Sequence, residues 1–434
     1  MADRIFQPET LAIHAGQIPD RETGARALPI YQTTSFVFDS ADHAASLFNL
    51  QTFGNVYSRL SNPTVAALEE RVAALEGGRA GLASASGMAA EAMALMTILQ
   101  QGDHVVAAGA LYGGTVTLLA VNLQRFGIET SFVDATSPEA FAAAMRPNTR
   151  AVFAESLGNP SLTVLDIAAV ADVAHAHGVP LIVDNTVPSP FLCNPLAWGA
   201  DIVVHSATKY LGGHGTTLAG VLVEGGKFPW DNGKFPGMTD PSPGYHGVKF
   251  HETFGDFAYS MRARVEVLRV YGSTLSAMAA WQILQGTETL HVRMERHCSN
   301  ARKVAQFLKD DPRCSWVNYP GLADHPHYDL TCKQMRQVDG APGASGLLAF
   351  GVKGGLEAGV RFIESAQVMS HLANIGDTRT LIIHPASTTH RQLEPDQQVQ
   401  AGVLPDMVRM SVGIEHIDDI LWDIDQALAA ASKA

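Results

Sequence analysis

One lysine follows two hydroxyl side chains at the end of an apolar segment, in the stretch ADIVVHSATKYLGGHG at 200–215. The first half of the stretch is rich in β-branched residues, as short buried strands are. Ser206, Thr208 and Lys209 come next, and then a run of glycines. An ammonium at the edge of a buried sheet is partly desolvated, which lowers its pKa and frees the amine as a nucleophile. An aldehyde, with which an amine forms a Schiff base, is the reaction partner that this chemistry favours.

Pyridoxal phosphate is an aldehyde cofactor, and the sequence offers candidates for the other groups that hold it. The turn SASGMAA at 84–90 predicts free backbone N–H groups and a helix N-terminus for the phosphate. Ser206 and Thr208 add hydroxyl donors. Asp184 closes the apolar run VPLIVD and is a carboxylate of the kind that pairs with the pyridinium nitrogen. Tyr112, before two glycines, would lie flat over the ring.

The elements that position these residues alternate along residues 62–225. Alanine-rich helical segments separate most of seven apolar runs, which are AGLASAS, DHVVAAG, TSFVDA, RAVFAES, VPLIVDN, ADIVVHS and AGVLVEG. Buried strands that alternate with helices predict an α/β fold with a mainly parallel seven-stranded sheet and helices on both faces. Such sheets bind ligands at the carboxyl ends of their strands, where the residues above, with Glu155 and Asn159, are expected.

Each of these residues taken alone has an ordinary structural explanation. Lys209 fits a surface cation, Asp184 a turn or helix cap, and Tyr112 a packing aromatic. Independent accidents would not all lie on one edge of one sheet, so the set favours a cofactor site. A non-catalytic phosphate- or nucleotide-binding module is the alternative of another class. It is disfavoured because no GxGxxG motif follows the first strand and the lysine follows a late one.

Composition narrows the class of protein and its partners. The 434 residues are 46% hydrophobic and carry a net charge of −13, which disfavours nucleic acid and anionic membranes as partners. No apolar run is long enough to span a bilayer, and the N-terminus lacks a secretory signal pattern. The four cysteines have no CxxC spacing and predict reduced thiols in the cytoplasm. The histidines lack the spacing of metal ligands, so no metal is expected.

Three regions are predicted along the chain. Residues 1–61, rich in Pro, Gly and Thr without helical periodicity, predict an extended arm that packs on a neighbouring subunit. Residues 62–262 predict the large cofactor-binding domain. Residues 263–434 predict a smaller α+β domain, in which long helices come first and the terminal helix contains EHIDDILWDIDQALAAA.

Short motifs occur in order along the whole chain: YSRLSNPT (57–64), LEGG (75–78), SASGMAA, LYGGT (111–115), ESLGNP (155–160), VDNT (183–186), HSATKYLGGHG, YPGL (319–322), HPASTTH (384–390) and VRMSVGIE (408–415). Together they resemble the Cys/Met-metabolism family of pyridoxal-phosphate-dependent enzymes. The resemblance implies the fold-type-I, aminotransferase-like architecture, with a catalytic set of Lys209, Tyr112 and Asp184. Lys209 would be the Schiff-base lysine, Asp184 the pyridinium partner, and Tyr112 a stacking residue that assists proton transfer at the leaving group.

The resemblance also implies roles for the remaining cofactor-binding residues. Backbone N–H groups of Gly87 and Met88 would bind the phosphate together with the hydroxyls of Ser206 and Thr208. Asn159 would bond the phenolic oxygen of the cofactor.

Further roles implied by the resemblance concern the substrate and the neighbouring subunit. Arg409 would clamp the substrate α-carboxylate, a task suited to its planar guanidinium. Tyr57 and Arg59 would reach the site of a neighbouring subunit, within a homotetramer built from dimers, and Tyr57 and Asn374 would also contact substrate. Ordinary interface contacts for Tyr57 and Arg59, and a domain-bridging ion pair for Arg409, are the structural alternatives.

Three segments distinguish reactions within the family. The segment NIGDTRTLIIHPASTTH (374–390) has Asn374 where the lyases and cystathionine synthases have serine. This segment, the opening LAIHAGQIPDRETGARALPIYQTTSFVF and DPSPGYHG (240–247) resemble members that join sulfide or methanethiol to O-acetyl-L-homoserine. That γ-replacement would give homocysteine or methionine, with Lys209 as both cofactor anchor and base. A methionine or cystathionine γ-lyase, or a sulfhydrylase of O-succinylhomoserine, is the alternative on the same fold.

Overall fold

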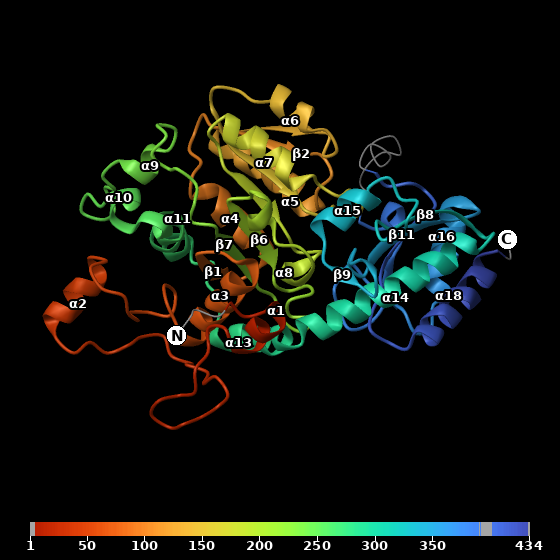
Figure 1. Ribbon diagram of the computed structural model, residues 1–434, viewed down its shortest axis with the longest axis horizontal. Coiled ribbons are helices and arrows are strands. Elements are labelled where there is room, and N and C mark those ends of the chain that lie inside the picture. Colours follow the sequence, from red (N-terminus) through yellow and green to blue (C-terminus); the bar gives the residue numbers. More distant parts are fainter. Residues whose placement is uncertain (1–4, 390, 392–401, 433–434) are drawn as a thin grey trace.

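The computed structural model describes residues 5–389, 391 and 402–432, and within them seven strands form the larger of two main sheets (Figure 1). The strand order is β1-β7-β6-β5-β4-β2-β3, and only β7 runs antiparallel to its neighbours. The strands are β1 Ala80–Ser84, β2 His104–Ala108, β3 Glu129–Val133, β4 Thr149–Glu155, β5 Leu181–Asp184, β6 Ile202–Ser206 and β7 Gly220–Glu224. The predicted seven-stranded, mainly parallel sheet is confirmed.

Helices cover both faces of this sheet. Helix α4 (Gly87–Met96) connects β1 to β2, and α7 (Ile167–Ala176) connects β4 to β5, in opposite directions along the sheet. Right-handed crossovers therefore place α4 and α7 on opposite faces. Helix α3 (Pro63–Glu76) has the punctuation that its sequence predicts: the Asn62 side chain accepts from Thr64 N at 3.0 Å, and Gly77 ends it at φ 69°.

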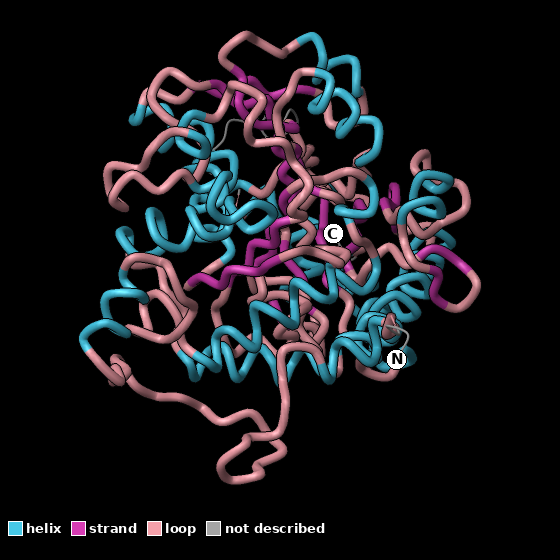
Figure 2. The backbone as a smooth tube through the Cα atoms, turned by 60° about the vertical axis from the view of Figure 1, so that its left-hand side comes forward, coloured by secondary structure: helices cyan, strands magenta, loops and turns pink. Residues whose placement is uncertain are grey.

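The N-terminal arm contains two short helices that its irregular sequence did not predict. Helix α1 (Pro8–His14) is held on α3 by the buried Arg71, whose guanidinium donates to the carbonyl of Ala12 at 2.7 Å. Helix α2 (Ala41–Phe48) is capped by Ser40, whose hydroxyl accepts from His43 N at 3.0 Å. A local cap stabilises α2, whereas α1 has no side-chain cap and depends on the long-range contact of Arg71. Figures 1 and 2 show α2 and the loops around it projecting from the body of the molecule.

A second sheet lies beside the first, on the right of Figure 1. Its order is β12-β13-β14-β11-β8, with β8 Cys314–Asn318, β11 Leu347–Val352, β12 Ser370–His371, β13 Leu381–Ile383 and β14 Met407–Ser411. Helices α14 (Leu290–Asp310), α16 (Gly355–Ser365) and α18 (Ile417–Ala431) share a buried apolar cluster with it. This is the smaller α+β region that the sequence predicts.

Shorter elements connect these layers. In the described part of the chain, no helix is long and apolar enough to cross a membrane. Residue 262, the predicted end of the large domain, lies in an unbroken helical run from 258 to 271, so that boundary stays a prediction. The remaining elements are α5 Gly113–Thr117, α6 Pro138–Ala143, α8 Ser189–Leu192, α9 Pro236–Thr239, α10 Phe250–Phe254, α11 Ala258–Arg262, α12 Arg269–Tyr271, α13 Ala277–Glu288, α15 Tyr328–Gln334, β9 Gln337–Val338, β10 Ala341–Pro342, the π-helices Leu118–Asn122 and Ala263–Leu268, and the 3-10 turns Leu123–Phe126, Pro195–Trp198, Gly255–Phe257 and Pro385–Ser387.

Candidate active site

A cavity of about 210 Å³ opens at the carboxyl ends of β4, β5 and β6. This is the edge at which an open parallel sheet binds its ligands. Its lining is Ser86, Gly87, Met88, Glu91, Tyr112, Glu155, Leu157, Asn159, Asp184, Thr186, Val187, Ser206, Thr208, Lys209, Leu218, Ala373, Ile375 and Arg409. Of the residues predicted for the site, Asn374, Tyr57 and Arg59 are missing from this lining.

Lys209 follows β6 and points its amine toward the second sheet. Its Nζ donates a hydrogen bond to Asn374 Oδ1, although the two residues lie 165 positions apart. Gly376, at φ 73°, makes this approach possible, because a Cβ there would lie 2.7 Å from Tyr210 N. Burial lowers the pKa of Lys209 to about 8, and the nearby charge of Arg409 acts in the same direction. At pH 7 about a tenth of the Lys209 side chains are therefore neutral amines, far more than for a lysine of ordinary pKa.

Arg409 reaches the cavity from β14 of the smaller sheet. Its guanidinium donates to Asn159 Oδ1 at 3.0 Å and to the Asn374 carbonyl at 3.2 Å. Burial lowers the pKa of Arg409 to about 10, which still leaves it charged at neutral pH. Asn374 thus contacts both cations, through its side chain to Lys209 and through its backbone to Arg409.

Asp184 is the last residue of β5 and faces the cavity between β4 and β6. The backbone N–H of Thr186 donates to its Oδ1 at 2.7 Å. Burial raises the pKa of Asp184, and hydrogen bonds from Thr186 and the charge of His205 oppose that rise. The carboxyl is therefore buried but has donors that stabilise its ionised form.

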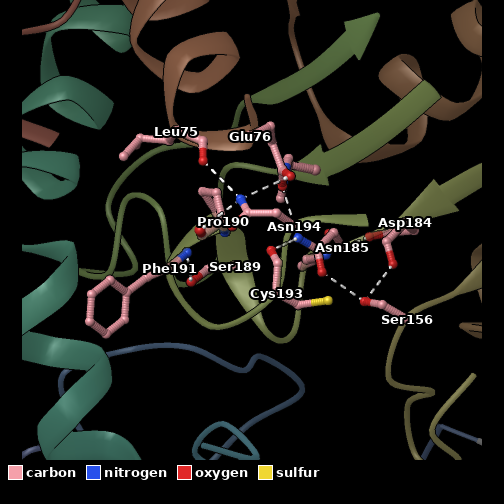
Figure 3. A network of polar contacts seen from close by, with 12 residues as sticks. Leu75, Glu76, Ser156, Asp184, Asn185, Ser189, Pro190, Phe191, Cys193 and Asn194 are labelled. Atoms are coloured by element: carbon pink, nitrogen blue, oxygen red, sulfur yellow. Dashed lines mark hydrogen bonds and ion pairs between the residues drawn. The ribbon is translucent and has the colours of Figure 1, made fainter. Parts of the chain in front are cut away.

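A network of buried side chains fixes the backbone around Asp184 (Figure 3). Ser156 Oγ donates to Asn185 Oδ1 at 2.8 Å, and Asn185 Nδ2 donates to Glu76 Oε1 and to the Cys193 carbonyl, both at 2.8 Å. Glu76, at the end of α3, also contacts His205 Nε2 at 2.6 Å. These contacts join α3, β4, β5 and β6 directly behind the cavity, and they hold the strand end that carries Asp184.

The start of α4 forms a cradle of a size and chemistry that fit a phosphate. Ser86 caps the helix by accepting from Ala89 N at 3.2 Å, which leaves the N–H groups of Gly87 and Met88 without helical acceptors. Gly87 packs directly on β6, since a Cβ there would lie 2.6 Å from Ser206 Cβ. Ser206 and Thr208 bring hydroxyls to the same end of the cavity. Oriented N–H groups, the helix N-terminus and hydroxyls are a common anion site.

Tyr112 lies at the mouth of the cavity and is 51% exposed. It immediately precedes α5, and its backbone N–H donates to Glu155 Oε1 at 2.5 Å. Gly114 leaves room for its ring, because a Cβ at that position would lie 2.6 Å from Tyr112 Cε1. The phenol ring is thus free to cover a flat ligand held below it.

Two buried acids in the cavity received no role from the sequence. Glu155, noted only as a strand-end residue, accepts the N–H groups of Tyr112 and Asn159. Glu91 lies on α4 and was not noticed at all. Its signal was available, because Glu91 is the only charged residue in the helix GMAAEAMALM and stands four positions after Gly87, which places both on one face.

Tyr57 and Arg59 lie outside the cavity of their own chain. The Arg59 guanidinium donates to the Arg269 carbonyl at 3.0 Å and lies 5.5 Å from the centre of the Tyr57 ring. Tyr57 is 40% exposed. Both residues therefore belong to the arm and not to this cavity, and a role in a neighbouring subunit stays a prediction.

A lysine amine, a buried carboxylate and a phosphate cradle at one edge of an α/β sheet define a pyridoxal-phosphate enzyme of fold type I. The family described as Cys/Met metabolism PLP-dependent enzyme matches residues 9–429, and the chain belongs to this family. Pyridoxal phosphate is therefore its cofactor. The donors described above fit that group: an amine for the aldehyde, an acid for the ring nitrogen and N–H groups for the phosphate.

Relatives within this family share most of their length with the chain. An O-acetyl-L-homoserine sulfhydrylase of Leptospira meyeri is 54% identical, covering 98% of this chain and 97% of its own. The O-acetyl-L-homoserine sulfhydrylase 1 of Thermus thermophilus is 52% identical over 97% and 99% of the two chains. A Campylobacter jejuni structure, assigned as an O-acetylhomoserine (thiol)-lyase and containing a pyridoxyl-lysine phosphate, superposes with a TM-score of 0.94 at 40% identity, over 98% and 100% of the chains.

Proposed function

We propose that the protein replaces the acetate of O-acetyl-L-homoserine by sulfide or methanethiol, giving homocysteine or methionine. Relatives at 44–54% identity over nearly the whole chain, which carry the names O-acetyl-L-homoserine sulfhydrylase and homocysteine/cysteine synthase, support this choice of reaction. One observation in the site supports an α-amino acid as the substrate: Asn374 joins the Lys209 amine to the Arg409 guanidinium. An amino acid whose α-carboxylate binds Arg409 has its α-carbon directed toward Lys209.

Each end of the cavity has a distinct task in this proposal. Arg409 binds the α-carboxylate through its planar guanidinium, and Asn374 keeps that guanidinium beside Lys209. Gly87 and Met88 bind the phosphate with their N–H groups, together with the hydroxyls of Ser206 and Thr208. Asp184 would pair with the ring nitrogen and Asn159 with the phenolic oxygen, and the Tyr112 ring would cover the cofactor.

Lys209 is the residue that moves protons. When bound, pyridoxal phosphate supplies an aldehyde for amines and a ring that withdraws electrons from the substrate α-carbon. The neutral Nζ of Lys209 takes the proton from Cα and then moves a proton at Cβ. Tyr112 assists proton transfer at the leaving group. In the net reaction the Cγ–O bond to acetate breaks and a Cγ–S bond to the sulfur nucleophile forms. Hydrogen sulfide or methanethiol loses one proton in this exchange, and the products are the thiol or thioether, acetate and that proton, which passes to solvent.

The cavity lining favours a small, uncharged acyl group. Within the described residues, Lys209 and Arg409 are the cations that line the cavity, and both already have tasks. The other charged residues in the lining are acids, and Leu157, Val187 and Leu218 give part of the wall an apolar surface. A succinyl carboxylate would lose its hydration here without gaining a counter-charge, whereas an acetyl group loses little.

The proposed unit is a homotetramer built from two dimers. Within each dimer, Tyr57 and Arg59 of one chain complete the site of its neighbour. The exposed apolar side chains of the arm, Val37, Phe48 and Phe53 among them, support a subunit contact there. The division into an arm (1–61), a large domain (62–262) and a small domain (263–434) is part of this proposal. So is a location in the cytoplasm, with which four free cysteines are compatible.

Product analysis with O-acetyl- and O-succinyl-L-homoserine, each with and without sulfide or methanethiol, tests the proposal. We expect homocysteine or methionine, with acetate, only when the acetyl ester and the sulfur donor are both present. Ammonia and a ketoacid released from methionine without added sulfide would instead identify a γ-lyase. Preferred turnover of the succinyl ester would identify the other sulfhydrylase.

A further inference from the structure

Glu91 is a buried carboxyl in the cavity to which the proposed function gives no task. It is 3% exposed and lines the same cavity as Asp184. Its Oε1 accepts from Thr115 Oγ1 at 3.0 Å, and its Oε2 is buried without a donor from any described residue. A carboxylate with one hydroxyl donor has too little stabilisation to keep a charge in such a place.

Three carboxyls face this cavity, and they differ in their donors. Glu155 accepts one backbone N–H at each oxygen, from Tyr112 and from Asn159. Asp184 accepts the Thr186 N–H at 2.7 Å. Glu91 has only a hydroxyl, so its charged form is the least stabilised of the three.

Glu91 and Asp184 line the same cavity, so the charge of one affects the pKa of the other. Burial, with the charge of Asp184 second, raises the pKa of Glu91 well above its ordinary value. Donation of a hydrogen bond from a protonated Glu91 to Asp184 would raise the pKa of Glu91 further and lower that of Asp184. Two ionised carboxylates have no proton to share, so one of the pair must be an acid.

We propose that Glu91 is a neutral carboxylic acid whose Oε2–H donates to Asp184 and thereby keeps Asp184 ionised beside the cofactor ring nitrogen. Glu91 is then a positioning residue, since it acts on the cofactor through Asp184. The inference rests on the proposed role of Asp184 and is independent of the choice of substrate.

The charged groups around the pair are compatible with this arrangement. Lys209 and Arg409 face the cavity from the segment after β6 and from β14, and each has a partner in Asn374. His205 of β6 lowers the pKa of Asp184 from behind. The cations therefore favour one anion at Asp184, and the neighbouring acids Glu91 and Glu155 disfavour a second.

Which group holds the shared proton depends on the relative basicity of the Asp184 carboxylate and the cofactor ring nitrogen. A donor on Asp184 weakens it as a base, so the proton between Asp184 and the ring nitrogen stays on the nitrogen. Without that donor Asp184 becomes the stronger base and takes the proton. Glu91→Gln keeps a donor to Asp184 and an acceptor for Thr115, whereas Glu91→Met keeps neither.

Nitrogen-15 NMR of the holoenzyme, loaded with cofactor labelled at the ring nitrogen, measures where that proton lies. We expect the protonated chemical shift in the unchanged enzyme and in Glu91→Gln, and a displacement toward the neutral pyridine shift in Glu91→Met. A protonated shift in all three proteins would overturn the role of Glu91. A neutral shift in the unchanged enzyme would instead overturn the proposed role of Asp184, and the inference with it.

Infrared difference spectroscopy tests the protonation of Glu91 itself. The unchanged holoenzyme at neutral pH should have a carbonyl stretching band of a neutral carboxylic acid that Glu91→Gln loses. Thr115→Val is the matched control, because it removes only the hydroxyl donor to Oε1 and should therefore retain the band at a shifted frequency. If Glu91→Gln lost no carboxylic acid band relative to the unchanged enzyme, Glu91 would be ionised and the proposal would be refuted.

Discussion

Lys209 combines two properties that a free lysine lacks. Its amine is held by Asn374 at a defined place in the cavity, and its pKa is lowered to about 8 by burial and by the charge of Arg409. Asp184 opposes this shift only in part. The same side chain can therefore attack an aldehyde and take a proton near neutral pH, which both of its proposed tasks require.

This pKa predicts how fast the apoenzyme captures pyridoxal phosphate at different pH values. The neutral amine is the reactive form, so the capture rate should rise about tenfold per pH unit below the pKa and level off above about pH 8. Stopped-flow absorbance of the bound cofactor measures the rate. In Arg409→Met the midpoint should move to higher pH, because a neighbouring positive charge is removed. A midpoint near the ordinary lysine value in the unchanged protein would contradict the assignment.

Residue types at strand ends were sufficient to predict that Lys209 and Asp184 lie in the cavity, because open parallel sheets bind ligands at the carboxyl ends of their strands. Arg409 and Asn374 came only from the family resemblance. Their contacts with the site depend on how two separate sheets meet, and no local pattern encodes that. Glu91 was missed although it is the only charged residue of an apolar helix, because that signal alone does not indicate a chemical role.

At the scale of elements, α4 packs directly against β6 in the site. Gly87 allows the helix N-terminus to approach Ser206, so that N–H groups and hydroxyls face the same space. Capping residues and glycines made α3 and α4 predictable from sequence. Helix α1 was not predictable in this way, since it depends on contacts of Arg71 with distant backbone, and the cap of α2 at Ser40 was not recognised in the sequence.

Gly87→Ala should weaken cofactor binding. The new methyl group would lie 2.6 Å from Ser206 Cβ, and relieving that overlap moves the helix start away from β6. If an overpacking cost of about 1–3 kcal/mol is relieved by displacing the cradle, cofactor affinity falls by roughly 5- to 150-fold, measurable by fluorescence titration. Gly113→Ala is the control, because a Cβ there meets nothing within 4 Å. Equal affinities of the two variants would argue against a close-packed cradle.

At the scale of the whole molecule, the arm exposes large apolar side chains to solvent when the chain is alone. It projects from the body in Figures 1 and 2 and exposes Val37 at 96% and Phe53 at 82%. Arg59 lies at its base, outside the cavity of its own chain. A shared active site would give these features a common explanation.

Mixed oligomers test the shared site. If Lys209 and Arg59 of different chains meet in one site, co-refolding Lys209→Ala with Arg59→Ala should restore about a quarter of the normal activity, since half of random dimers are mixed and each has one intact site. Lys209→Ala mixed with Asp184→Ala is the control, because both residues come from one chain and no intact site can form. Equal activities of the two mixtures would exclude sharing through Arg59.

The covalent partner of the cofactor is the most direct test of the whole account. Borohydride reduction of the holoenzyme, followed by proteolysis and mass spectrometry, should find one pyridoxyl adduct, on the peptide that contains Lys209. Lys209→Ala should lose both this adduct and turnover. An adduct on another lysine, or none on Lys209, would contradict the central claim.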